Sequence, residues 1–142
     1  MYSIQKAMIK HLQEGRHNYF NYVDKNNIKA YAGELTPENI IQLSNILPSI
    51  MVMPQPSKPV GPQPDINLDI IVITKSDSFD KVTNQNNNMQ LTEDVYKFIL
   101  GNPHLSDDEK SWQIVFENLE IKLVAIDSKF AVVVIGCELT EL

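Results

Sequence analysis

The chain has 142 residues, a formal net charge of −6 and an isoelectric point near 4.9. Hydrophobic residues make up 43% of it and charged residues 21%, which is typical of a globular domain and excludes a disordered chain. The acidic balance argues against a general nucleic-acid binder, which needs a basic surface to displace counterions. The single cysteine, Cys137, excludes an internal disulfide and a cysteine-built zinc site. The N-terminal residues lack the apolar run of a signal peptide, and no segment reaches membrane-spanning length, which predicts a cytoplasmic protein.

The first half of the chain predicts two helices and three strands. Residues 2–14 have the apolar spacing of an amphipathic helix, with Gly15 as its stop. Thr36 and Pro37 are typical of the N-cap and first position of a short second helix, which must end before Pro48. The expected strands are 28–32, 49–53 and 66–74. The last is apolar on both faces, which indicates a central strand covered on both sides.

Two stretches are expected to be extended loops. Five of the eight prolines fall between Pro54 and Pro64, and each fixes φ and removes a backbone donor. Residues 54–65 therefore cannot form a helix or a central strand, and they are expected to act as a semi-rigid arm. Residues 76–89 are polar and rich in Asn, and they are expected to form a surface loop.

The second half predicts one helix followed by three strands. Residues 91–100 carry one apolar stripe, with Gly101 beyond the end of the helix. The run from Ser106 to Glu109 has the acidic character of a short helix start. Strands are expected at 112–116, 119–126 and 130–137, and the short turns between them predict an antiparallel β-meander.

The element order predicts a single α+β domain over residues 1–142. We expect a mostly antiparallel sheet of about five to six strands, with two to three helices packed on it and a C-terminal β-meander.

The sequence contains no recognisable catalytic or ligand-binding motif, so we expect no catalytic residue, no cofactor and no metal ion. His11 lies on the inner edge of the first helix, whereas His17 and His104 are expected in polar turns, and the spacing of the three matches no metal motif. None of the five glycines lies in a phosphate-binding order. Cys137 lies in an apolar run, where a buried thiol is expected.

Two alternatives from other functional classes remain open. A small metal-dependent hydrolase would use Asp107, Asp108 and Glu109 with His104, although a helix cap is the favoured interpretation of that acidic run. A nucleic-acid-binding module would use the basic first thirty residues. Its stacking groups would be Tyr19, Phe20 and Tyr22.

The succession of elements resembles the tail-terminator proteins of Mu-like contractile-tailed phages and related phage-tail-like particles. The resemblance covers nearly the whole chain and contains no catalytic or ligand motif. The residues that carry it are the helix 3–9, the segments 31–35, 47–52 and 68–76, the Val95-Tyr96 helix, Trp112 and the closing meander.

The resemblance implies a structural protein of the virion, encoded by a phage or prophage, and not an enzyme. Such proteins form a ring, usually a hexamer, that caps the tail tube, ends its polymerisation and presents a surface to the head or neck. The implied partners are other copies of the chain, the tail tube protein and the sheath and neck proteins, with no membrane and no direct nucleic-acid contact. The implied location is the bacterial cytoplasm during assembly and then the particle. The alternative within phage assembly is a head-completion or neck adaptor protein.

A ring uses heterologous interfaces, in which one patch of a subunit meets a different patch on its neighbour. The two long loops are the candidate patches because they extend beyond the packed domain. The predicted subunit or tube contacts within them are Pro56, Lys58, Val60, Phe79 and Val82.

Overall fold

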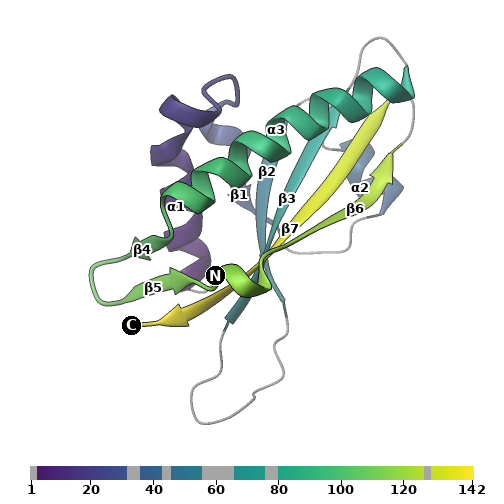
Figure 1. Ribbon diagram of the computed structural model, residues 1–142. Helices are drawn as coiled ribbons and strands as arrows, with labels where there is room; N and C mark the ends of the chain where they lie inside the picture. The colour runs from purple at the N-terminus through teal and green to yellow at the C-terminus, as the bar shows by residue number, and fades with distance from the viewer. Residues whose placement is uncertain (1–2, 32–35, 43–45, 56–65, 76–79, 127–128) are drawn as a thin grey trace.

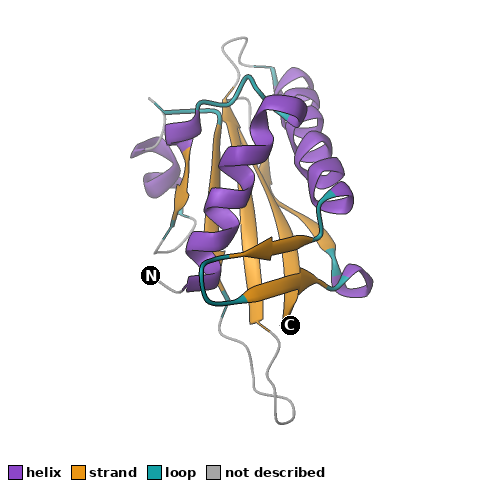
Figure 2. Ribbon diagram, turned by 90° about the vertical axis from the view of Figure 1, so that its left-hand side faces the viewer, coloured by secondary structure: helices purple, strands orange, loops and turns teal. Residues whose placement is uncertain are grey.

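The computed structural model describes residues 3–31, 36–42, 46–55, 66–75, 80–126 and 129–142 (Figure 1). Its centre is one curved sheet, and α3 and α2 lie on opposite sides of it (Figure 2). The helices are α1 (Ser3–Tyr19), α2 (Pro37–Gln42) and α3 (Lys81–Gly101), with 3₁₀ turns η1 (Lys25–Asn27) and η2 (Phe116–Asn118). The strands are β1 (Ile28–Ala30), β2 (Ser49–Pro54), β3 (Ile66–Lys75), β4 (His104–Ser106), β5 (Ser111–Ile114), β6 (Glu120–Ile126) and β7 (Phe130–Glu141).

The sheet has seven strands in the order β1-β2-β3-β7-β5-β4, and β6 also pairs with β7. The longest ladder joins β3 and β7, from Ile66 opposite Leu139 to Lys75 opposite Phe130. Every described pair is antiparallel except β1 with β2. The predicted α+β fold with a mostly antiparallel sheet is therefore confirmed.

The predicted C-terminal meander is only partly correct. β6 and β7 form the expected hairpin, in which Glu120 lies opposite Gly136. β5 does not pair with β6, however, but with the end of β7, where Trp112 lies opposite Glu141. β7 is long enough to accommodate both strands in succession along one edge. The η2 turn carries the chain from one to the other.

The core has two parts because β3 and β7 carry apolar side chains on both faces. Residues such as Ile70, Val72 and Ile135 pack under α1 and α3 in the larger part. On the other face, Ile71 and Val132 belong to a smaller cluster. Partly buried side chains from the segment around α2 cover this smaller cluster: Tyr31, Ile46 and Leu47. The prediction of a central strand covered on both sides is thus confirmed for β3.

The first helix continues past the predicted stop at Gly15. A Cβ at this position would lie 2.1 Å from Cε2 of Phe98, so the missing side chain makes room for that ring. Gly15 therefore serves helix packing and not helix termination. The Phe98 ring also lies against His11 and Tyr19 of α1, at centroid distances of 4.8 and 5.3 Å.

The prediction of an extended loop at 76–89 is wrong for residues 81–89, which form the first turns of α3. Asp80 is the N-cap: its carboxylate accepts hydrogen bonds from the backbone N–H groups of Val82 and Thr83, each at 3.3 Å. Polar residues take the inward positions of these turns, since Asn84 and Asn88 are buried. Because these buried positions are polar, the spacing of apolar residues did not indicate a helix here. Residues 76–79 lie outside the described part.

The proline segment connects two antiparallel neighbours, β2 and β3. The β2–β3 pairing continues to the edge of the segment, because the Gln55 backbone N–H donates to the carbonyl of Asn67 at 2.8 Å. Residues 56–65 lie outside the described part. Among the described helices, none is both long and apolar enough to cross a membrane.

Candidate functional site

The three histidines do not form a cluster, because two lie on α1 and one lies on β4. His11 is partly buried, and one ring nitrogen forms a 2.8 Å hydrogen bond with the carbonyl of Asn102, which joins α1 to the end of α3. His17 lies on α1 and not in a turn, and His104 lies on β4; both are exposed. Within the described residues, no three His, Cys, Asp or Glu side chains are grouped closely enough to hold a metal ion.

The acidic run Asp107–Glu109 does not begin a helix, which corrects the predicted cap. It forms the turn between β4 and β5, closed by a hydrogen bond from Asp107 N to the Lys110 carbonyl at 2.9 Å. The Asp107 carboxylate accepts from the backbone N–H groups of Glu109 and Lys110, at 2.8 and 2.7 Å. These bonds hold the pKa of Asp107 below its usual value. An aspartate that accepts from its own turn in this way is a turn residue.

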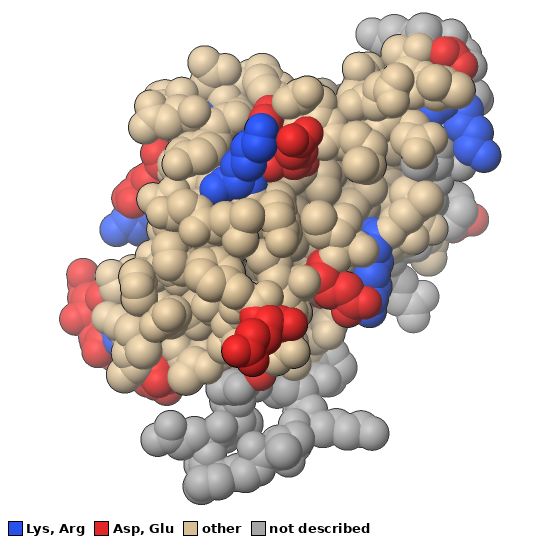
Figure 3. All heavy atoms as spheres, in the orientation of Figure 1, with Lys and Arg blue, Asp and Glu red and all other residues tan. Residues whose placement is uncertain are grey.

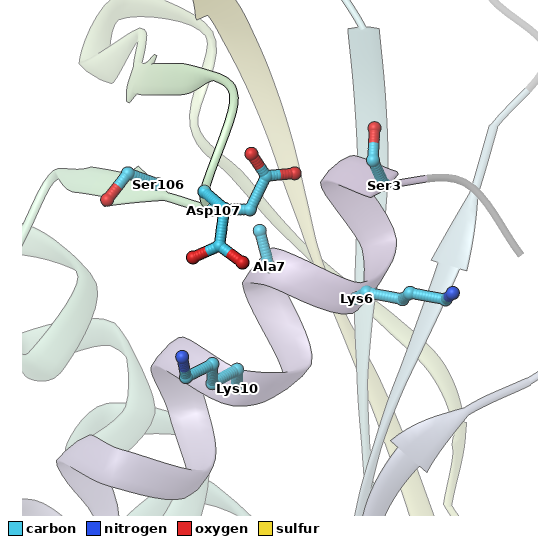
Figure 4. Close-up of a pocket in the computed structure, with 7 residues that line it drawn as sticks. Ser3, Lys6, Ala7, Lys10, Ser106 and Asp107 are labelled. Carbon is cyan, nitrogen blue, oxygen red and sulfur yellow. The ribbon is translucent and has the colours of Figure 1, made fainter.

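A pocket of about 320 Å³ lies between this turn and the start of α1 (Figure 4). It is lined by Lys6 and Lys10 on one side and by Asp107 and Asp108 on the other. The Lys6 ammonium points away from the aspartates in Figure 4, so it does not form a charged cluster with them. Lys10 forms an exposed pair with Glu14 at 3.9 Å, one turn along the same helix. The pocket therefore has charge but no focused site for a ligand.

A second pocket, of about 290 Å³, lies beside the middle of α3 and the end of β3. One of the residues that line it is Thr74, whose buried hydroxyl oxygen has no hydrogen-bond partner in the described part. Tyr22 also lines it, and its hydroxyl donates to Asp94 at 2.6 Å. Burial, with the nearby Asp94, raises the pKa of Tyr22. The pocket offers scattered single polar groups and no pair suited to proton transfer.

Cys137 is buried, as predicted. Burial, reinforced by the charge of Asp69, raises the pKa of its thiol to about 12. A neutral, enclosed thiol is a poor nucleophile, so Cys137 is a core residue.

The proposed stacking platform for nucleic acid does not form. Phe20 is fully buried in the core. Tyr19 packs edge-on against Phe98, and Tyr22 is held by Asp94. The three aromatic residues therefore do not present parallel exposed faces to a strand of bases.

Four of the predicted contact residues, Pro56, Lys58, Val60 and Phe79, lie outside the described part. The fifth, Val82, lies in the first turn of α3, not in a loop, and its side chain is 63% exposed.

Val82 belongs to a larger set of exposed apolar side chains, which we call the α3–β6 surface. It consists of Val82, Met89 and Leu100 on α3 with Ile121 and Leu123 on β6. Met89 and Leu123 are 53% and 61% exposed, which is far more than a core side chain tolerates. Figure 3 shows uncharged surface between α3 and β6, with charged side chains on α3 and at the edges of this area.

The geometry of α3 places its exposed apolar side chains on one flank of the helix. Asp94 and Phe98 mark the flank of the helix that faces α1, because Asp94 binds Tyr22 and Phe98 packs against the rings of α1. Val82 and Met89 are two turns apart on the opposite flank. Since α3 lies between α1 and β6 in Figure 1, this opposite flank faces β6.

β6 lies at an edge of the sheet, and in the described part it pairs with β7 alone. The sequence predicted a strand here but placed it between two others, where both of its edges would be paired. The alternation of Glu120, Ile121, Lys122 and Leu123 was visible in the sequence. Their exposure was not, because it depends on β5 pairing further along β7.

The fold and this surface define a class: a small α+β domain with a single curved sheet and exposed apolar side chains along one edge. No known family model matches the chain, and no curated protein matches it in sequence.

Proposed function

We propose that the chain is a structural assembly protein of a contractile phage tail or tail-like particle, acting as a tail terminator. In this role it forms a ring on the end of the tail tube, ends tube polymerisation and presents a surface to the head or neck. The observation that carries the proposal is the α3–β6 surface. Exposed apolar side chains on a helix flank and a neighbouring strand edge are typical of a surface that another protein covers.

The chemistry of the described pockets supports a structural role more than a catalytic one. The Asp107 carboxylate is engaged by the backbone of its own turn, and Lys10 pairs along its own helix. A hydrolase would instead need carboxylates or histidines from several elements converging on one point.

The proposal assigns partners and a location. The ring consists of copies of this chain, usually six in the tail terminators that the chain resembles. One face of the ring contacts the tail tube. Val82 then contributes to a protein contact as part of the α3–β6 surface. The protein acts in the bacterial cytoplasm during assembly and remains in the finished particle, near the sheath and neck.

The test is a tube-capping assay with a tail tube protein from the phage or prophage that, on this proposal, encodes the chain. Wild-type protein added to polymerising tubes should shorten them and narrow their length distribution, as measured by negative-stain electron microscopy. Leu123→Lys should abolish this effect, because it places a charge in the α3–β6 surface. Leu142→Lys is the matched control, since Leu142 is 68% exposed and lies at the end of the chain, away from this surface.

Unchanged tube lengths with the wild-type protein would contradict the proposal. The appearance of particles assembled without this protein distinguishes a terminator from an adaptor. Loss of a terminator leaves tails of uncontrolled length, whereas loss of an adaptor leaves normal tails that do not join heads.

A further inference from the structure

The edge of β6 is the longest unpaired strand edge in the described part of the sheet. β6 spans seven residues, whereas the other outer strands, β1 and β4, span three each. At β1, the Ile28 carbonyl is already bound by the Gln13 side chain at 2.9 Å. An unpaired edge of this length is a template for another strand.

The side chains of β6 alternate between charge and apolar surface. Ile121 lies opposite Ile135, and Leu123 lies opposite Val133, so both point to the face that α3 covers. Glu120 and Lys122 point to the other face and approach each other to 3.5 Å along the strand. The regular register ends after Leu123, where a bulge begins.

We infer that β6 pairs antiparallel with β6 of a second copy of this chain, about a two-fold axis at Ile121. In this register Glu120 lies opposite the partner's Lys122, and Lys122 lies opposite the partner's Glu120. Ile121 lies opposite the partner's Ile121 on the α3 face. Opposite charges in directly facing positions stabilise an antiparallel pair, and like charges destabilise it.

The charge pattern selects this register over its neighbour. Centring the pair on Lys122 places two lysines directly opposite each other, and Glu120 then faces Val124. The bulge between Leu123 and Ala125 prevents regular pairing further along the strand. Only the pairing about Ile121 matches both glutamate–lysine positions within the regular part of β6.

The same pairing covers the α3–β6 surface. A two-fold axis perpendicular to the sheet keeps both α3 helices on one face of the joined sheet. Met89 and Leu100 on each helix then flank the joined Ile121 and Leu123 side chains. A two-fold contact closes on itself and does not extend into a ring, so the inference concerns the isolated protein and does not rest on the proposed function.

A charge-exchange experiment tests the inference by sedimentation and light scattering. The wild-type protein should have twice the chain mass of 16.2 kDa. Lys122→Glu makes both positions acidic and Glu120→Lys makes both basic, so each variant alone should halve the observed mass. An equimolar mixture of the two variants should restore the double mass. Glu120 and Lys122 are both exposed, so each variant should fold, and circular dichroism checks this.

Lys97→Glu is the matched control, because Lys97 is an exposed lysine on α3 that pairs with Glu93 of the same helix. It should leave the mass unchanged. A wild-type monomer, or a wild-type oligomer that both single variants retain, would overturn the inference. Tube capping is measured separately, so either proposal can fail while the other stands.

Discussion

Asn88 is the residue that joins α3 to the centre of the sheet. Its side-chain amide donates to the carbonyls of Val72 and Ala131, at 3.2 and 3.0 Å, and its oxygen accepts from the Thr92 hydroxyl at 2.9 Å. The side chain is 1% exposed, so these bonds form away from water. A buried amide is tolerated only when its polar atoms are paired, and here protein groups pair both ends of it.

Replacing Asn88 with Ala should lower the free energy of unfolding by about 1–3 kcal/mol, because buried hydrogen-bonding groups lose their partners. Urea denaturation followed by circular dichroism measures this loss. Asn86→Ala is the control: the residue lies on the exposed side of the same helix, and its replacement should have little effect. Equal stabilities of the two variants would contradict the role given to Asn88.

Residue type alone misleads at Asn88 and at Gly15. An asparagine-rich run is typical of a loop, and a glycine after an apolar helix is typical of a stop. Both patterns are overridden by contacts made far along the chain: Asn88 with the sheet, and Gly15 with Phe98. No local pattern contains that information, because it depends on how the elements pack.

At the scale of elements, the start of α3 depends on the ionised Asp80 side chain. Hydrogen bonds from the Thr83 hydroxyl and from the backbone N–H groups of Val82 and Thr83 lower the pKa of Asp80 from 3.8. The folded state therefore favours the carboxylate. The resulting stabilisation is complete above the unfolded-state pKa and is lost as the pH falls through the lower folded-state pKa.

Asp80→Asn should remove this pH dependence, because asparagine also caps helices but does not titrate. The difference in Tm between wild type and variant should be constant above pH 5. Below pH 4, the Tm of the wild type should fall relative to the Tm of the variant. Thermal melts from pH 6 to pH 2 measure it. A difference that stays constant over the whole range would show that the Asp80 charge does not stabilise α3.

Most elements were predictable from the sequence, but their neighbours in the sheet were not. The strands at β2, β3 and β7 follow from dense apolar runs, and the Thr36 cap is confirmed by its hydrogen bond from Asn39 N at 3.2 Å. The position of β5 depends instead on which part of β7 it meets, and short turns do not determine that. The exposed edge of β6 is a consequence of that pairing. The α3–β6 surface was therefore beyond sequence reasoning, except for Val82.

At the scale of the whole molecule, the two faces of the sheet are unequally covered. Both long helices lie on one face, yet α3 leaves β6 and its own outer flank exposed. An apolar edge strand is an aggregation hazard unless a partner covers it. Both proposals, the tail-terminator ring and the two-fold pair, give this surface a protein partner.

Hydrogen exchange tests this central claim most directly, by comparing the free protein, diluted until its two-fold pairs dissociate, with the protein bound to the tail tube. The account predicts slower amide exchange in β6, and in α3 near Met89, in the bound state. Exchange in the β4–β5 turn at Asp107–Lys110 should not change. Equal exchange of β6 in both states, with slowing confined to other segments, would contradict the account.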